Sequence, residues 1–163
     1  HLRISKIHLS SALKVRDLRP ETLDQLEAFC EPTYLHQVLA NSPSLQSTPR
    51  PQRPEPKAIR AFEDLPIALA ARRAGEDTTE EWRVHFHIPL HAEPLPPLLS
   101  TSDHLLGTLD YVAEHPETCQ HFEMETYTWG VMPEPLHTQT VVDQVTAEYN
   151  WLLPQLAQRN LLP

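Results

Sequence analysis

Short strand patterns alternate with helical patterns along this chain, and no other feature of the sequence constrains the fold as much. The expected strands cover residues 5–10, 34–39, 83–90 and 121–127. The expected helices begin near Pro20, at Asp64, at Ser102 or Asp103, and at Thr138 or Thr140. This rhythm favours right-handed crossover units and a mainly parallel sheet, so the sequence predicts an α/β fold with three or four strand-helix units.

The strand at 83–90 carries two histidines on one face. Because side chains alternate along a strand, His85 and His87 point to one side, whereas Val84 and Phe86 point to the other. Two imidazoles on the same face of a strand can bind one metal ion. The simpler alternative is a pair of inward histidines that are satisfied by hydrogen bonds. We expect metal or substrate binding.

The strand at 121–127 carries two carboxylates in the same arrangement. Glu123 and Glu125 share one face, and Phe122 and Met124 share the other. Carboxylates that point into a barrel are rarely buried without a partner. A histidine pair and a carboxylate pair on two predicted strands therefore indicate a metal site in a barrel mouth.

Composition excludes several classes of partner. The 163-residue chain has 22 acidic and 13 basic residues, and its net charge of −9 repels phosphate backbones, which argues against nucleic acid. Its apolar runs fall short of the ~20 residues that span a bilayer, so no transmembrane segment is expected. Cys30 and Cys119 are isolated, which is typical of a reduced, cytoplasmic protein.

Three segments have less regular patterns. The proline-rich segment at about 41–57 predicts a surface loop. The run 34–39 leaves open whether it is a barrel strand or an inserted hairpin. In the last helix Pro154 predicts a kink or a break. The apolar side chains that recur there at helical spacing are Val141, Val145, Tyr149 and Leu152.

The first strand adds another histidine to the candidate site. His8 is on the face of its strand that is opposite to Ile7 and Leu9. Like Glu125, it lies near the C-terminal half of its strand. Active residues of parallel barrels sit at the C-terminal ends of the strands, but a closed eight-stranded barrel needs ~250 residues. We therefore expect residues 1–163 to be a fragment of a single, larger barrel domain.

Three motifs resemble a known family. The runs 4–13, 82–90 and 123–129 together are similar to the C-terminal part of the EboE-like metabolite traffic proteins. That family belongs to the xylose isomerase-like TIM-barrel superfamily, which also includes the endonuclease IV type of apurinic endonuclease. The resemblance implies a TIM (β/α)8 barrel, and it implies that the remainder of the barrel lies upstream of His1.

The resemblance also implies a ligand set. By motif position, His8 resembles a histidine that ends a late strand, His85 and His87 resemble an acid-x-histidine pair, and Glu125 resembles the closing glutamate. His85 stands where the endonucleases carry a carboxylate. This departure from the endonuclease pattern argues against phosphodiester chemistry. The other ligands of the superfamily lie on earlier strands.

The residue types suit a catalytic divalent metal. Imidazole and carboxylate ligands favour zinc, manganese or iron over calcium. We expect a metal-dependent isomerase, epimerase or hydrolase that acts on a small metabolite of secondary metabolism, with Glu123 and Glu125 in catalytic roles. The alternative is a non-catalytic protein for metabolite binding or trafficking. An apolar ligand would require a mouth lined by residues such as Phe86, Leu95, Leu98 and Met132.

Weaker candidates have simpler explanations. His36 and His91 are expected to be solvated loop histidines, although either could act as a ligand. Lys6 and Arg83 are expected to pair with the glutamates, and Glu123 is itself a possible salt-bridge partner. Tyr127 and Trp129 could line a pocket, but aromatic packing is the simpler explanation.

Overall fold

The computed structural model describes residues 4–41, 59–133 and 140–162. The fold is α/β, as predicted, and the described residues form no closed barrel. The chain divides into two compact units. The first unit comprises residues 1–13, 87–94 and 100–163, and the second comprises 14–86 and 95–99.

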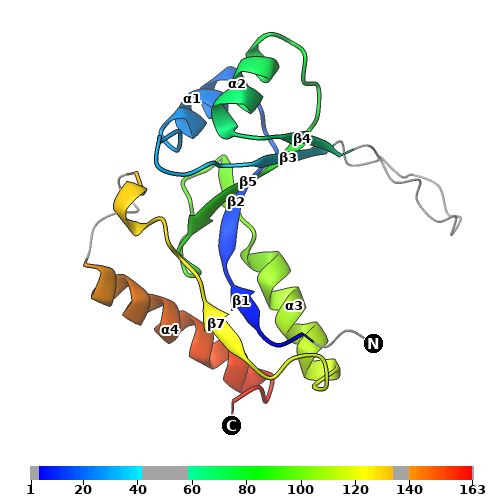
Figure 1. The fold of residues 1–163 in the computed structure, drawn as a ribbon, viewed down its shortest axis with the longest axis vertical. Helices are drawn as coiled ribbons and strands as arrows, with labels where there is room; N and C mark the ends of the chain where they lie inside the picture. Colours follow the sequence, from blue (N-terminus) through cyan, green and yellow to red (C-terminus); the bar gives the residue numbers. More distant parts are fainter. Residues whose placement is uncertain (1–3, 42–58, 134–139, 163) are drawn as a thin grey trace, which may run out of the picture. The chain divides into compact units, whose positions relative to one another are not determined.

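The first unit contains a two-stranded parallel sheet and two long helices (Figure 1). Strand β1 (Ile7–Leu9) pairs in parallel with β7 (Phe122–Met124). The helical elements are α3 (Ser102–Glu114), the 3-10 helix η1 (Trp129–Val131) and α4 (Val141–Gln158). The predicted strand at 121–127 is therefore shorter than expected, and Glu125 follows directly after it.

Leucine side chains from several elements form the core of the first unit. Leu105 and Leu109 of α3 and Leu152 and Leu156 of α4 join Leu9 in one buried cluster. Ile7 and Leu9 are the apolar face of β1, so His8 is directed away from this core, as the alternation predicts. The core thus fixes which side of the strand is available for polar chemistry.

Helix α4 buries only part of the face that its apolar residues indicate: Leu152 is buried, as the spacing predicts, and Val145 is partly buried. Thr140 caps the helix by accepting a hydrogen bond from the Asp143 amide at 3.2 Å. The helix then continues through Pro154, so the predicted break is absent; proline removes only one intrahelical hydrogen bond. Val141 and Tyr149, which share the predicted spacing, are exposed. The buried face consists of Gln144, Glu148, Leu152 and Leu156.

A five-stranded sheet has the order β4-β3-β5-β2-β6, and the boundary between the units falls within β2, β5 and β6. Its strands are β2 (Ser11–Val15), β3 (Val38–Asn41), β4 (Arg60–Phe62), β5 (Glu81–Ile88) and β6 (Leu98–Ser100). The first predicted strand, 5–10, contains β1, whereas β2 begins at Ser11 and was not predicted. Strands β4 and β6 were not predicted, because three residues are too few to establish a periodicity.

Strand β3 pairs antiparallel with both of its neighbours, which differs from the parallel pairing that the strand-helix rhythm predicts. Val38 of β3 lies opposite Phe62 of β4 on one side and opposite Val84 of β5 on the other, both in antiparallel register. The sequence between β3 and β4 has no helical pattern, whereas the connection between parallel neighbours is usually a helix. The end of the run 34–39 belongs to the antiparallel pair of β3 and β4. The proline-rich loop predicted at about 41–57 lies outside the described residues apart from Asn41, the last residue of β3.

Two helices complete the second unit, α1 (Pro20–Glu27) and α2 (Leu65–Arg73), which contact each other (Figure 1). As predicted, Asp64 caps α2 and Gly75 follows its end, at a φ of 75° that suits glycine. The ring of Phe86, on the apolar face of β5, meets Phe29 edge to face at 5.1 Å between centroids. No helix among the described residues has the length and apolar character to span a bilayer.

Candidate functional site

The polar face of the β1–β7 pair holds His8 and both candidate catalytic glutamates. The register places His8 opposite Glu123, and the Glu125 amide donates to the Leu9 carbonyl at 3.0 Å, one step beyond the strand. Side chains at opposite positions of paired strands are neighbours on one face. The pairing therefore brings a histidine and two carboxylates together from segments more than a hundred residues apart.

Each nitrogen of the His8 ring faces a carboxylate. Nδ1 lies 2.9 Å from Oε2 of Glu125, and Nε2 lies 3.7 Å from Oε2 of Glu123. Lys6 forms an ion pair with Glu123, as expected, and this hydrogen-bonded ammonium lowers the pKa of the Glu123 carboxyl. All four side chains are exposed to solvent by at least 39%, so water screens their charges.

His87 lies at the end of β5 within the first unit and is buried. Its Nδ1 lies 2.8 Å from the backbone carbonyl of Glu125, which can only accept a hydrogen bond, so Nδ1 carries a proton. In the neutral ring the lone pair is then on Nε2. Thr128 donates its hydroxyl to the His87 carbonyl, and the Tyr127 ring lies 4.6 Å from the imidazole between centroids. These contacts hold both the backbone and the ring of His87.

The structure brings the His8 ring to the Glu125 carboxylate and the His87 ring to the Glu125 backbone carbonyl, whereas His85 belongs to the second unit. His85 is exposed, while Val84 and Phe86 are fully buried, which confirms the predicted alternation. Its amide donates to the Gln37 carbonyl at 2.8 Å.

The donor set fits part of a metal site. Within the described ranges, no group of three or more His, Cys, Asp and Glu side chains is arranged to hold one ion. Two ligands of a tetrahedral zinc ion stand roughly 3.4 Å apart, so the 2.9 Å between His8 and Glu125 needs to open by about 0.5 Å. A ligating histidine commonly donates its other ring N–H to a carbonyl or carboxylate, as His87 does to Glu125. His8 and Glu125 therefore fit as neighbouring ligands, and His87 has the required tautomer.

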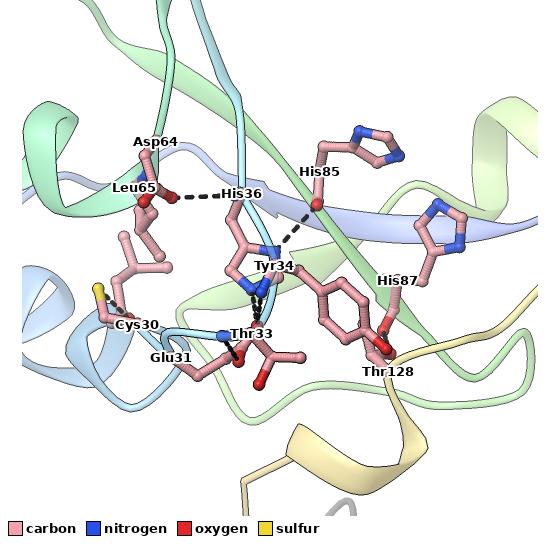
Figure 2. Close-up of polar contacts among 11 residues, drawn as sticks. Cys30, Glu31, Thr33, Tyr34, His36, Asp64, Leu65, His85, His87 and Thr128 are labelled. Atoms are coloured by element: carbon pink, nitrogen blue, oxygen red, sulfur yellow. Dashed lines mark hydrogen bonds and ion pairs between the residues drawn. The ribbon is translucent and has the colours of Figure 1, made fainter.

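A buried histidine in the second unit has a different environment (Figure 2). His36 is fully buried, with Nε2 at 2.8 Å from Oε1 of Glu31 and Nδ1 at 3.2 Å from the His85 carbonyl. Its backbone amide donates to the Asp64 carboxylate at 2.9 Å. His36 is therefore part of the packed core and not the solvated loop histidine that the sequence suggests.

Glu31 is the residue of this cluster that the sequence did not single out. Burial raises the pKa of its carboxyl, but hydrogen bonds from Thr33, His36 and Tyr34 outweigh that effect, and the pKa is lowered overall. Glu31 lies in the segment between α1 and β3, five residues before His36, where the sequence has no periodic pattern that would identify it as a partner of a buried histidine.

Several weaker candidates have structural roles. Arg83 pairs with Glu81 at 3.3 Å. Burial raises the pKa of the Glu81 carboxyl, but the hydrogen bonds from Arg16 and Arg83 outweigh burial, so this pKa is lowered overall. Trp129 is buried, which agrees with aromatic packing, and His91 is exposed. Of the residues expected to line an apolar mouth, only Leu95 is exposed; the buried ones are Phe86, Leu98 and Met132.

Comparisons of the chain with known protein families, with curated proteins and with solved structures find no match.

Proposed function

We propose that this chain belongs to a divalent-metal-dependent isomerase, epimerase or hydrolase that acts on a small polar metabolite, in which His8 and Glu125 are neighbouring ligands. The observation that supports this proposal is the 2.9 Å separation of His8 Nδ1 and Glu125 Oε2 at the ends of two parallel strands. Imidazole and carboxylate together suit zinc, manganese or iron. Such an ion, when bound, polarises a carbonyl or lowers the pKa of a water molecule.

The family part of the proposal rests on the three motifs. We propose a C-terminal part of a TIM barrel of the EboE-like type, whose further ligands come from upstream strands. Support comes from the parallel β1–β7 pair, because parallel neighbours are what a TIM barrel contains. The antiparallel β3–β4 pair is then an insertion relative to that barrel.

The chain's own residues have distinct roles in this proposal. His8 binds through Nδ1, which must lose any proton before it ligates. His87 carries its proton on Nδ1, which donates to the Glu125 carbonyl, so Nε2 is the nitrogen through which the neutral ring would ligate. Glu123 is held by Lys6, and its lowered pKa keeps it ionised and makes it a weak base near pH 7. It therefore orients His8 rather than abstracting a proton, and His85 remains a candidate ligand.

Metal titration of four variants tests this assignment. We expect Zn²⁺ or Mn²⁺ to bind the purified protein, as measured by calorimetry. His8→Ala, Glu125→Gln and the double variant His85→Ala, His87→Ala should weaken binding by more than about 100-fold, which exceeds the usual cost of losing an outer hydrogen-bond partner. His104→Ala is the matched control, because His104 is an exposed histidine on α3, and its affinity should equal that of the wild type.

Two results would overturn the proposal. One is the absence of any protein-bound metal in the wild type at millimolar concentrations. The other is equal affinity in the wild type, His8→Ala and Glu125→Gln. If no metal binds, Lys6, His8, Glu123 and Glu125 form a surface ion-pair network. The non-catalytic metabolite-binding alternative would then take precedence.

A further inference from the structure

Glu148 is a buried carboxylate on the inward face of α4, and the metal-site proposal assigns it no role. It is 1% exposed and lies one helical turn before Leu152, which belongs to the leucine core. A buried carboxylate is costly unless hydrogen bonds compensate it. Its Oε1 accepts two of them, from the Leu90 amide at 2.9 Å and from the Thr126 hydroxyl at 2.8 Å.

Those two donors belong to the two segments that carry the candidate site. Leu90 lies three residues after His87, and Thr126 directly follows Glu125. One oxygen of Glu148 therefore bridges the chain after β5 to the chain after β7. The same two segments meet again where His87 Nδ1 donates to the Glu125 carbonyl at 2.8 Å.

We propose that Glu148 is a positioning residue that fixes the His87 imidazole against the Glu125 carbonyl. The bridge keeps the two segments at the separation that the hydrogen bond between His87 and Glu125 requires. That hydrogen bond in turn selects the tautomer with the proton on Nδ1 and the lone pair on Nε2. The consequence for metal affinity rests on the proposed function, whereas the consequence for the tautomer does not.

The chemistry of the bridge defines a conservative variant. Both hydrogen bonds end on one oxygen, so the single carbonyl oxygen of a glutamine can accept both. Glu148→Gln should therefore keep the His87 tautomer, and Glu148→Ala should lose it. A role that depends on negative charge would make the glutamine variant behave like alanine.

The direct measurement is the ¹⁵N NMR spectrum of the His87 ring, which distinguishes the two neutral tautomers. We expect the Nδ1–H form in the wild type and in Glu148→Gln, and a mixture of tautomers in Glu148→Ala. Because Glu148→Ala could fail to fold, Thr126→Val removes one donor while retaining the shape of the side chain, and it should shift His87 in the same direction. Gln144→Ala is the matched control, one turn earlier on the same buried face of α4, and should leave the His87 spectrum unchanged.

Metal titration separates this proposal from the proposed function. Where the wild type binds metal, Thr126→Val and Glu148→Ala should weaken affinity by about 10-fold, within the range for outer partners of a ligand. A tautomer shift without metal binding in any form would support the positioning role and contradict the metal site. An unchanged His87 spectrum in both Thr126→Val and a folded Glu148→Ala, or a shift of the same size in Gln144→Ala, would overturn the positioning role.

Discussion

His87 in the first unit and His36 in the second unit are both buried histidines that meet a backbone carbonyl, yet their surroundings differ. Nδ1 of His87 faces the Glu125 carbonyl, while Nδ1 and Nε2 of His36 face the His85 carbonyl and the Glu31 carboxylate. A ring that donates at both nitrogens is the imidazolium form, which has no lone pair to offer a metal ion. The carbonyl at Nδ1 of His87 selects one neutral tautomer, whereas the carbonyl and the carboxylate around His36 suit a structural ion pair.

His8 is the third case, between these two. It also has a carboxylate near each nitrogen, at hydrogen-bond distance only for Nδ1, but its ring and both carboxylates are exposed. Water compensates the loss of either partner, so this arrangement can rearrange at little cost. Burial therefore separates the structural ion pair of His36 from the adaptable one of His8.

The largest expected effect is the loss of stability in His36→Ala. This substitution leaves the Glu31 carboxylate without its buried partner and opens a cavity beside Phe86, whose ring lies 4.6 Å from the imidazole. We expect the free energy of unfolding in urea to fall by about 3–5 kcal/mol. His8→Ala should change it by less than about 1 kcal/mol, as for exposed ion pairs. Equal losses in the two variants would refute the distinction drawn from burial.

Acid should weaken the second unit through Glu31, a smaller effect than the loss of His36. The folded pKa of Glu31 lies below its ordinary value of 4.5, so its stabilising contribution is complete above pH 4.5 and is lost as the pH falls through the folded value. The difference in unfolding free energy between the wild type and Glu31→Gln should therefore shrink between pH 5 and pH 3. A difference that stays constant over this range would show that the Glu31 charge does not contribute.

Local patterns predicted the strand that carries His87 and the polar faces that carry His8 and Glu123. The alternation in β5 is long enough to define its buried side, and the Asp64 cap and Gly75 define α2. The same alternation placed His8 and Glu123 on polar faces. These features depend on neighbours a few residues apart, which a single sequence displays directly.

Long-range pairing could not be predicted in the same way. Nothing local indicates that β1 pairs with β7, or that Glu148 bonds to Leu90, which lies 58 residues away. The apolar pattern on α4 identified Leu152 but missed Glu148, because a sequence pattern does not show that a buried carboxylate has two hydrogen-bond donors. His36 was misjudged for the same reason, since its burial depends on Glu31 and on a strand far along the chain.

The smallest expected effect is in Lys6→Met, which tests whether the exposed cluster around His8 behaves as an adaptable network. Removal of the ammonium should raise the pKa of Glu123 toward its ordinary value of 4.5, as followed by the carboxyl ¹³C shift in an NMR titration. The urea midpoint should stay unchanged, because water replaces the lost partner. Arg73→Met is the matched control: it also removes one positive charge, but its partners are Asp24 and Glu27 in the second unit. If both variants raise the pKa of Glu123 equally, overall charge rather than Lys6 controls this carboxylate, and Glu123 has no fixed role beside His8.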